Sequence, residues 1–162
     1  MKDYPNKIII KDGYAVMLLY NKEGRVIQRT LISIESIESV SKYRWCLDQC
    51  HNYVVNNTVG RLHRYIMNCP KGVCVDHING NTLDNRLENL RLCNHQQNMY
   101  NRKTPKTNTS GHVGVSLNRV GNWRARIKVE GREMCKTFKN IGDAIAWREY
   151  MEKKHHKEFR RK

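Results

Sequence analysis

The sequence lacks any apolar stretch long enough to cross a bilayer. Its first ten residues, MKDYPNKIII, also lack the apolar core and small-residue cleavage site of a secretory signal peptide. We therefore expect a cytoplasmic protein with no membrane partner. Acidic residues are few, because 15 Asp and Glu stand against 30 Lys and Arg, and the net charge is +15. This excess indicates a polyanionic partner, and it favours nucleic acid over a membrane surface.

The six cysteines include no C-x2-C pair. Cys46/Cys50 and Cys69/Cys74 have the looser spacings C-x3-C and C-x4-C, which leave a structural zinc site open as an alternative. A disulfide framework is not expected without a secretory signal. We therefore favour free thiols over a zinc site.

Hydrophobic patterning predicts a β-rich N-terminal segment over residues 1–60, within a chain whose length suits one or two small domains. Alternating and apolar runs predict strands within 7–20 and 25–34, and NKEG between them predicts a turn. A short helix is expected within 33–45. A second helix, within 61–70, is expected to end at Pro70.

A different pattern follows Arg102–Gly111, a polar stretch that predicts a linker, which we place at 103–110. Alternation then predicts three strands, in HVGVSLNR, NWRARIKV and REMCKTF. The last segment, NIGDAIAWREYMEKKHHKEF, has the spacing of an amphipathic helix with Asn140 as its N-cap. Residues 111–162 are therefore predicted to form a three-stranded antiparallel sheet with one helix.

The segment VDHINGNTLDNRLENLRLCNHQQNMYN, residues 75–101, contains no lysine and many amides around one Asp-His pair. It predicts a strand ending at Asp76-His77, a tight turn at the Asn-Gly pair, an irregular loop and a second strand in LRLC. Asn94 is a candidate N-cap for a following helix, with Gln97 completing a capping box. The fold class is therefore α+β.

This layout can bring Asp76 and Asn98 together around one divalent cation. Carboxylate and amide oxygens suit Mg²⁺ or Mn²⁺ better than zinc, and two protein ligands leave positions for water and phosphate. His77 is expected to point to the opposite side of the backbone unless the strand bends. A neutral imidazole there can accept a proton from water, which suits phosphodiester hydrolysis.

The motifs LHRYIM, VDHINGNTLDNRLENLR and QQNMYN closely resemble those of HNH homing endonucleases of phages and mobile introns, over roughly residues 30–102. The resemblance implies the ββα-metal fold, with its nuclease core placed at 61–102. It implies that His77 activates the attacking water and that Asn89 holds the loop by backbone hydrogen bonds. It further implies that Asp76 and Asn98 bind the metal. Many HNH proteins have histidine instead of asparagine at the last of these positions. The upstream His63 and Arg64 receive no assigned role beyond packing or phosphate contact.

A second resemblance covers about residues 109–158, where GV, W-x-A-x-I, TF and an alanine-containing helix follow the order of AP2 DNA-binding domains. It implies a sheet in the DNA major groove with the helix packed behind it. Alternation turns Trp123, Ala125, Ile127 and Val129 toward the helix. The candidate DNA-contacting residues are Ser116, Asn118, Arg119, Arg124, Arg126, Lys128, Arg132 and Met134. Ser116 and Met134 differ from the arginine and tryptophan common in plant members, so no target sequence carries over.

The favoured hypothesis is therefore a monomeric, metal-dependent endonuclease that acts on double-stranded DNA without a small-molecule cofactor. It would be of the homing type, and it would nick one strand because a monomer has a single site. The alternatives are a non-catalytic DNA-binding regulator with a relic nuclease fold, or a restriction or host-defence nuclease. Arg86 and Arg91 are expected either to touch phosphate or to pair with Asp84 or Glu88. We expect four further histidines to be solvated: His95, His112, His155 and His156.

Overall fold

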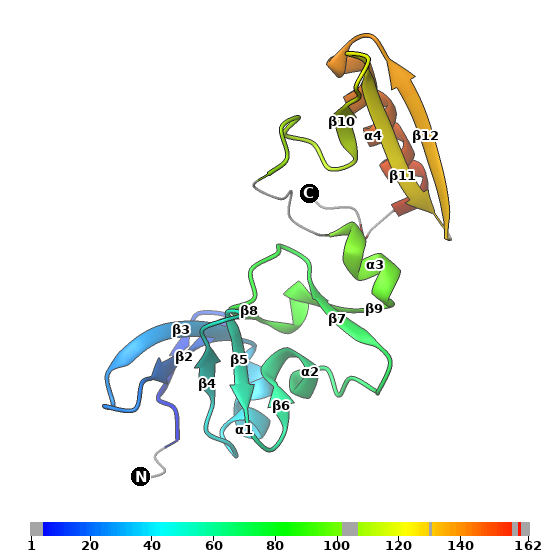
Figure 1. Cartoon of the computed structure of the whole chain (residues 1–162). Coiled ribbons are helices and arrows are strands. Elements are labelled where there is room, and N and C mark those ends of the chain that lie inside the picture. Colours follow the sequence, from blue (N-terminus) through cyan, green and yellow to red (C-terminus); the bar gives the residue numbers. More distant parts are fainter. Residues whose placement is uncertain (1–4, 102–106, 130, 157–158, 160–162) are drawn as a thin grey trace. The chain divides into compact units, whose positions relative to one another are not determined.

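The computed structural model describes residues 5–101, 107–129, 131–156 and 159. Within them the chain is a mixed α+β protein with several small sheets and few helices, as expected (Figure 1). Two compact units divide the chain, residues 1–99 and residues 100–162. No helix in these ranges is long and apolar enough to cross a bilayer.

The first unit begins with a four-stranded sheet in the order β1-β2-β3-β8. Its strands are β1 (Ile8–Lys11), β2 (Tyr14–Tyr20), β3 (Val26–Ile32) and the short β8 (Asp84–Asn85). Ala15, Met17 and Leu19 alternate along β2 and are fully buried, as period-2 patterning predicts. The β8 strand pairs parallel to the end of β3, with Leu31 opposite Asp84. The N-terminal sheet therefore includes two residues of the Asp-His segment.

A second sheet of three strands packs on the same core. It contains β4 (Cys46–Asp48), β5 (Tyr53–Asn56) and β6 (Gly60–Arg61). The short helices around it are η1 (Ile34–Ser36), α1 (Ile37–Val40) and α2 (Leu62–Ile66). Trp45 lies in this core at 1% exposure, and its indole N–H donates to the Val40 carbonyl at 2.9 Å. α2 ends before Pro70, because Asn68 already has a positive φ of 42°.

The Asp-His segment forms a strand, a loop, a second strand and a helix, in the expected order. These are β7 (Cys74–His77), β9 (Leu90–Cys93) and α3 (His95–Tyr100), with β7 and β9 antiparallel. The loop between the strands is more regular than expected, because it contains β8 and the 3₁₀ turn η2 (Leu87–Asn89). Asn94 and Gln97 form the predicted capping box. The backbone N–H of each residue donates to the side-chain oxygen of the other at 2.8 Å.

The second unit contains the predicted sheet and helix. The sheet has the order β10-β11-β12 and is antiparallel, with β10 (Val115–Leu117), β11 (Trp123–Val129), β12 (Arg132–Phe138) and helix α4 (Ile141–His156). Asn140 caps α4 as predicted, since its side-chain oxygen accepts the Gly142 N–H at 2.6 Å. Part of the expected linker, 103–106, lies outside the described residues, whereas Ser110 already bonds to the carbonyl of Val115 at 2.7 Å.

Candidate active site

The frame of the site is the β7–β9 ribbon and the loop that joins its strands. Asp76 lies opposite Arg91 and His77 lies opposite Leu90. Directly after β7 the chain turns at Gly80, whose φ is 69° and whose N–H donates to the His77 carbonyl at 2.8 Å. A positive φ at this position suits glycine, so the Asn-Gly pair turns the chain immediately beyond the histidine.

His77 is buried, with 4% of its surface exposed. Burial lowers the pKa of its imidazole, and this effect outweighs the hydrogen bond with Asn85 and the charges of Asp76 and Asp84, which act in the opposite direction. The ring is therefore neutral at pH 7, which is the form that can accept a proton.

A buried chain of hydrogen bonds orients the His77 ring. The Thr30 hydroxyl donates to the Leu83 carbonyl at 2.7 Å, and the Asn85 amide N–H donates to the Thr30 oxygen at 2.9 Å. The Asn85 carbonyl oxygen then faces His77 Nε2 at 3.2 Å. Because that oxygen can only accept, the neutral ring carries its proton on Nε2, and Nδ1 is the basic nitrogen. Thr30 lies 55 residues from Asn85, so nothing local in the sequence indicates this contact.

His63, from the LHR motif, lies against the same ring. Its centroid is 5.0 Å from that of His77, and Tyr53 lies 5.1 Å from His63 on another side. Burial, followed by the nearby charges of His77, Arg61 and Arg64, lowers the pKa of His63 to about 3. A neutral His63 adds no positive charge next to His77. The LHR motif singled out His63 in the sequence, but it did not indicate that the ring would pack against His77.

Asp76 is also buried, and it faces the side of the ribbon away from His77, as strand alternation requires. Arg91 donates to Asp76 Oδ2 through Nε at 2.9 Å and Nη2 at 2.6 Å. The salt bridge predicted for Arg91 was to Asp84 or Glu88, and the structure gives Asp76 as the partner instead. Phosphate contact by Arg91 stays a prediction. Arg91 was misassigned because its partner lies across the ribbon, 15 residues away.

Asn89 holds the loop through its side chain and backbone. Its side-chain oxygen accepts the Asn79 N–H at 3.0 Å, and its amide donates to the Asp84 carbonyl at 2.8 Å. Its own carbonyl accepts the Ile78 N–H at 2.9 Å. Asn89 therefore connects the turn after His77 to the strand that holds Asn85.

Arg86 and Asp84 stabilise the same loop. Arg86 donates to both oxygens of Asp84 at 2.8 Å and also pairs with Glu88 at 2.6 Å, as one of the two predictions for Arg86 had it. Burial alone would raise the pKa of Asp84, but the bonds from Arg86 and Asn79 hold it below its ordinary value. Asp84 is thus an ionised structural anchor.

Asn98 lies on α3, where its side chain is partly exposed. Its backbone N–H donates to the carbonyl of the capping residue Asn94 at 3.0 Å. The helix that follows β9 thus carries one of the predicted oxygen donors, while β7 carries the other. Carboxylate and amide oxygens are ligands that suit a hard cation. The Asp76 carboxylate already binds one positively charged group, the guanidinium of Arg91.

Arg64, the other LHR residue, is structural. Its guanidinium donates to the carbonyls of Val73 at 2.6 Å, Pro70 at 3.0 Å and Cys69 at 3.4 Å. These bonds fix the loop between α2 and β7. Of the two possibilities for Arg64, packing and phosphate contact, its observed contacts are those of a loop anchor.

The cysteines are free thiols on several elements. Cys74 and Cys93 lie opposite each other in the β7–β9 ribbon, whereas Cys46 belongs to β4. Among the described residues no cluster of three or more His, Cys, Asp or Glu side chains could hold a metal ion. Burial raises the pKa of the Cys93 thiol to about 11, which keeps it protonated.

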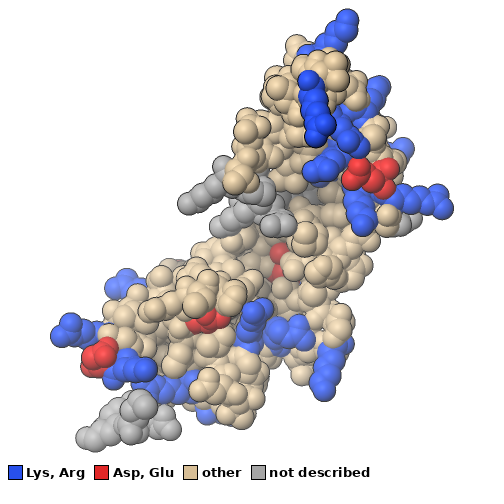
Figure 2. Space-filling model, in the orientation of Figure 1, with Lys and Arg blue, Asp and Glu red and all other residues tan. Residues whose placement is uncertain are grey.

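The second unit exposes cations on one face of its sheet. Arg124, Arg126 and Lys128 alternate along β11 with Ala125 and Ile127, which are buried. α4 covers the buried side. Ser116 pairs with Arg124 and shares the exposed face. Figure 2 shows many Lys and Arg side chains, and few Asp or Glu, on the visible surface of this unit.

The pairing of β12 with β11 places two candidate DNA-contacting residues on the opposite face of the sheet. Met134 pairs with Ile127, and Arg132 pairs with Val129, so both belong to the side that the helix covers. Glu133, Cys135 and Thr137 occupy the cationic face of β12 instead. Sequence alternation does not fix pairing between strands, which is why this division was missed.

Asn118 and Arg119 lie in the turn after β10. The Asn118 side-chain oxygen accepts the N–H groups of Val120 at 3.0 Å and Asn122 at 2.9 Å. Asn118 therefore shapes the turn, while Arg119 is exposed.

The prediction that four histidines are solvated was wrong for His156, which is buried and stacks on Tyr100 at 3.5 Å between ring centroids. Burial lowers its pKa to about 4. The pattern failed because the apolar partner, Tyr100, lies far away along the chain.

Comparison with known proteins identifies the segment that contains these residues. Residues 68–100 match the model of the HNH endonuclease family, and they include Asp76, His77, Asn89 and Asn98. The chain therefore carries a domain of the HNH endonuclease family. No solved structure matches the chain.

Two viral proteins are similar to the chain over longer stretches. Protein 3.8 of Escherichia phage T7 is 40% identical over 79 residues, which cover 48% of this chain and 65% of that protein. An uncharacterized HNH endonuclease, L560, of Acanthamoeba polyphaga mimivirus is 35% identical over 118 residues, covering 68% of this chain and 59% of that protein. The chain thus spans less than two thirds of the length of either relative.

Proposed function

We propose that the protein is a metal-dependent DNA endonuclease in which His77 is the general base. One observation carries this proposal: the ring is neutral, its proton is assigned to Nε2 by Asn85, and it stands next to a buried carboxylate at the end of β7. A base of this kind must be unprotonated and oriented before the substrate arrives, and both conditions are met. The family match over the same residues supports the reaction class.

In the proposed reaction, His77 Nδ1 accepts a proton from the attacking water as the new phosphorus–oxygen bond forms. The bond from phosphorus to the leaving oxygen breaks on the opposite side, and that oxygen takes a proton from solvent. Asn89 acts by position, since it holds the turn that follows His77. His63 and Tyr53 pack against the imidazole and restrict its rotation.

Asp76 and Asn98 would hold one Mg²⁺ or Mn²⁺ ion. When bound, the ion supplies positive charge that stabilises the phosphate as it gains negative charge. Arg91 now supplies such charge to Asp76, so the carboxylate has to exchange or share this partner when it binds a cation. The hard oxygen donors favour these two ions over zinc.

The second unit would hold the DNA. Its exposed cations on β11 are spaced two residues apart, about 7 Å along a strand, which suits contacts with successive phosphates. Ser116, Arg119, Arg124, Arg126 and Lys128 are the proposed contacts. The order of three strands and a helix is the one that the AP2 resemblance implies. Arg132 and Met134 take no part in this face.

We further propose that the enzyme nicks one strand, acts as a monomer and is of the homing type, in a phage- or virus-infected cell. The similar viral proteins support the setting. The rival function, a DNA-binding regulator with a relic nuclease fold, is weaker because His77 keeps its full set of orienting contacts.

A plasmid assay tests the proposal. Supercoiled plasmid with the purified protein and Mg²⁺ should convert to the open circle, and EDTA should stop the reaction. Asp76→Ala should lose the response to added Mg²⁺ while it still retards DNA in a gel. Activity that survives thorough chelation would contradict the metal-dependent mechanism. A protein that binds plasmid but never cuts it would favour the regulator.

A further inference from the structure

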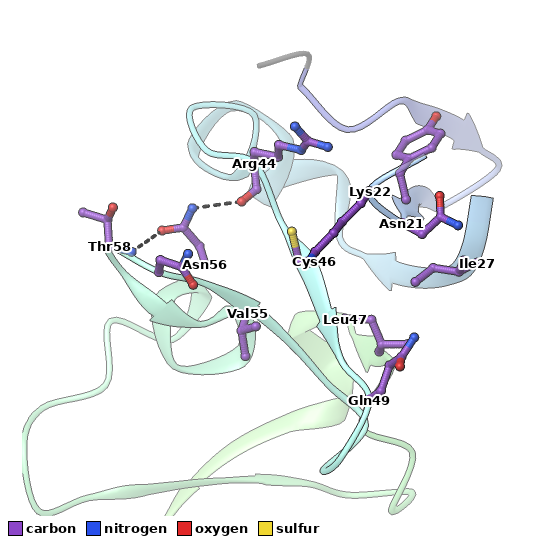
Figure 3. A pocket seen from close by; sticks show the side chains of 12 residues that line it. Asn21, Lys22, Ile27, Arg44, Cys46, Leu47, Gln49, Val55, Asn56 and Thr58 are labelled. Atoms are coloured by element: carbon purple, nitrogen blue, oxygen red, sulfur yellow. Dashed lines mark hydrogen bonds between the residues drawn. The ribbon is translucent and has the colours of Figure 1, made fainter. Parts of the chain in front are cut away.

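We propose that a groove on the first unit binds the DNA strand that flanks the scissile phosphate, which rests on the nuclease function proposed above. The groove has a volume of about 650 Å³ and lies between the β2–β3 hairpin and the β4–β5 strands. Figure 3 shows Asn21, Lys22 and Ile27 on one wall, with Cys46, Leu47 and Gln49 following β4 on the other.

The lining has the chemistry of a nucleic-acid contact. Two cations, Lys22 and Arg44, stand among amides and a tyrosine, and no Asp or Glu is found among the described residues that line the groove. Ile27, Leu47 and Val55 add an apolar surface against which sugars or bases can pack. A polyanion with flat, partly apolar bases fits this combination better than a small neutral ligand does.

Several of the polar side chains are available for a ligand. Asn21 and Asn56 are not, because Asn21 accepts the Arg25 N–H at 2.8 Å and Asn56 donates to the Arg44 carbonyl at 2.9 Å. Among the residues that the structure describes, the side chains of Lys22, Gln49 and Asn57 make no hydrogen bond or ion pair. Asn21 and Asn56 therefore form part of the walls, while Lys22, Gln49 and Asn57 can donate hydrogen bonds to a ligand.

The groove and His77 share one face of the β4–β5–β6 sheet. Tyr53 and Val55 alternate with the buried Val54, so both turn away from the core. Val55 lines the groove, while the Tyr53 ring lies 6.2 Å from the His77 ring. Arg61 pairs with Val55 and places its guanidinium 4.6 Å from the Tyr53 ring centroid, on this same face.

Spacing fits a continuous strand of DNA. Two residues of β5 span about 7 Å, and the Tyr53 ring lies a further 6.2 Å from the His77 ring. Together these distances place the near end of the groove roughly four nucleotide steps of about 3.4 Å from His77. Asp48 is the carboxylate on this face, and His51 donates to it at 2.9 Å. A strand cut near His77 would therefore reach Lys22 a few nucleotides away.

The test uses the full chain and a DNA duplex with the mapped cleavage site near its middle. Lys22→Glu puts a carboxylate in the groove, and Lys11→Glu makes the same charge change at the exposed end of β1, outside it. We expect Lys22→Glu to weaken binding several-fold more than Lys11→Glu. It should also flatten the dependence of log affinity on log salt by about 0.9 more. Asn57→Asp should weaken binding in the same direction.

Shortening the duplex on one side of the cleavage site sharpens the test. Once the DNA no longer reaches the groove, Lys22→Glu and the wild type should bind it equally, while the effect of Lys11→Glu should not change. Equal affinities for Lys22→Glu and Lys11→Glu on the long duplex would overturn the groove while leaving the nuclease intact. A wild-type protein that binds but never cuts DNA would overturn both proposals.

Discussion

The two units treat polar side chains in opposite ways. Among its described residues the first unit buries nine polar or charged side chains, and hydrogen bonds connect three of them, Thr30, Asn85 and His77. A fourth, Asn89, donates to the carbonyl of Asp84, which precedes Asn85. The second exposes its arginines and lysines along β11, and its buried His156 has no hydrogen-bond partner for either ring nitrogen in the described part of the chain. Buried networks fix geometry, whereas exposed cations supply charge. This contrast agrees with the proposed division, in which the first unit carries the chemistry and the second supplies much of the DNA affinity.

Removing the proposed base should separate the two units most clearly. His77→Ala should lower the cleavage rate by about 10²–10⁴-fold, because no other group replaces the lost proton acceptor. DNA affinity should stay near that of the wild type, since it depends on phosphate contacts elsewhere. Single-turnover cleavage and gel retardation measure the two quantities. His95→Ala, on the exposed first turn of α3, is the control, and wild-type cleavage by His77→Ala would contradict the assignment.

Acid should weaken the first unit through His63. The pKa of this ring is about 3 in the folded chain and about 6.5 when unfolded, so the unfolded chain binds more protons between these values. Its contribution to stability is complete above pH 6.5 and falls by about 2 kcal/mol at pH 5. Urea unfolding at pH 7 and pH 5 measures it. His63→Gln should reduce the pH difference, and His95→Gln should keep it; equal differences in both variants would refute this origin.

Thr30 tests whether the long hydrogen-bond chain matters to catalysis. Thr30→Val keeps the shape and removes the hydroxyl that accepts from Asn85. We expect a cleavage rate about five- to tenfold lower, the equivalent of one hydrogen bond, with DNA affinity preserved. Thr30→Ser restores the hydroxyl and should restore most of the rate. If valine and serine behave alike, Thr30 acts by packing alone.

A single cation on the second unit should give the smallest effect. Lys128→Gln should weaken DNA binding a few-fold and flatten the salt dependence by about 0.9, the contribution of one phosphate contact. Lys153→Gln, on the exposed side of α4, provides the matched loss of one charge away from the sheet. A salt titration by fluorescence anisotropy measures both. Identical slopes of log affinity against log salt for the two variants would contradict DNA binding by the cationic face of the sheet.

Local signals in the sequence were sufficient for most elements. Alternation located the strands of the second unit, and the Asn94–Gln97 and Asn140 caps are formed as predicted because caps involve neighbours three residues apart or fewer. A candidate site could be proposed from the sequence as a set of residues, because the Asp-His segment carries a family pattern. Its contacts could not, since the partners of His77 and Asp76 are set by strand pairing.

Register and burial explain the remaining errors. The side of the sheet that Met134 occupies could not be read from the sequence, because it depends on how β12 pairs with β11. His156 follows two lysines and one histidine in the sequence, and only Tyr100 explains why it is buried. Both properties arise from contacts between segments that are far apart in the chain, where propensity carries no information.

The pairing of β3 with β8 has a consequence for how the protein is made. Thr30 contacts Leu83 across 53 residues of sequence, so the ribosome delivers one strand well before the other. The β2–β3 hairpin can form during synthesis, before the Asp-His loop has been made. The β8 strand of that loop can then pair with the β3 strand that is already in place. Residues 68–100 alone would lack this β3 strand. The N-terminal strands are thus the surface against which the Asp-His loop packs.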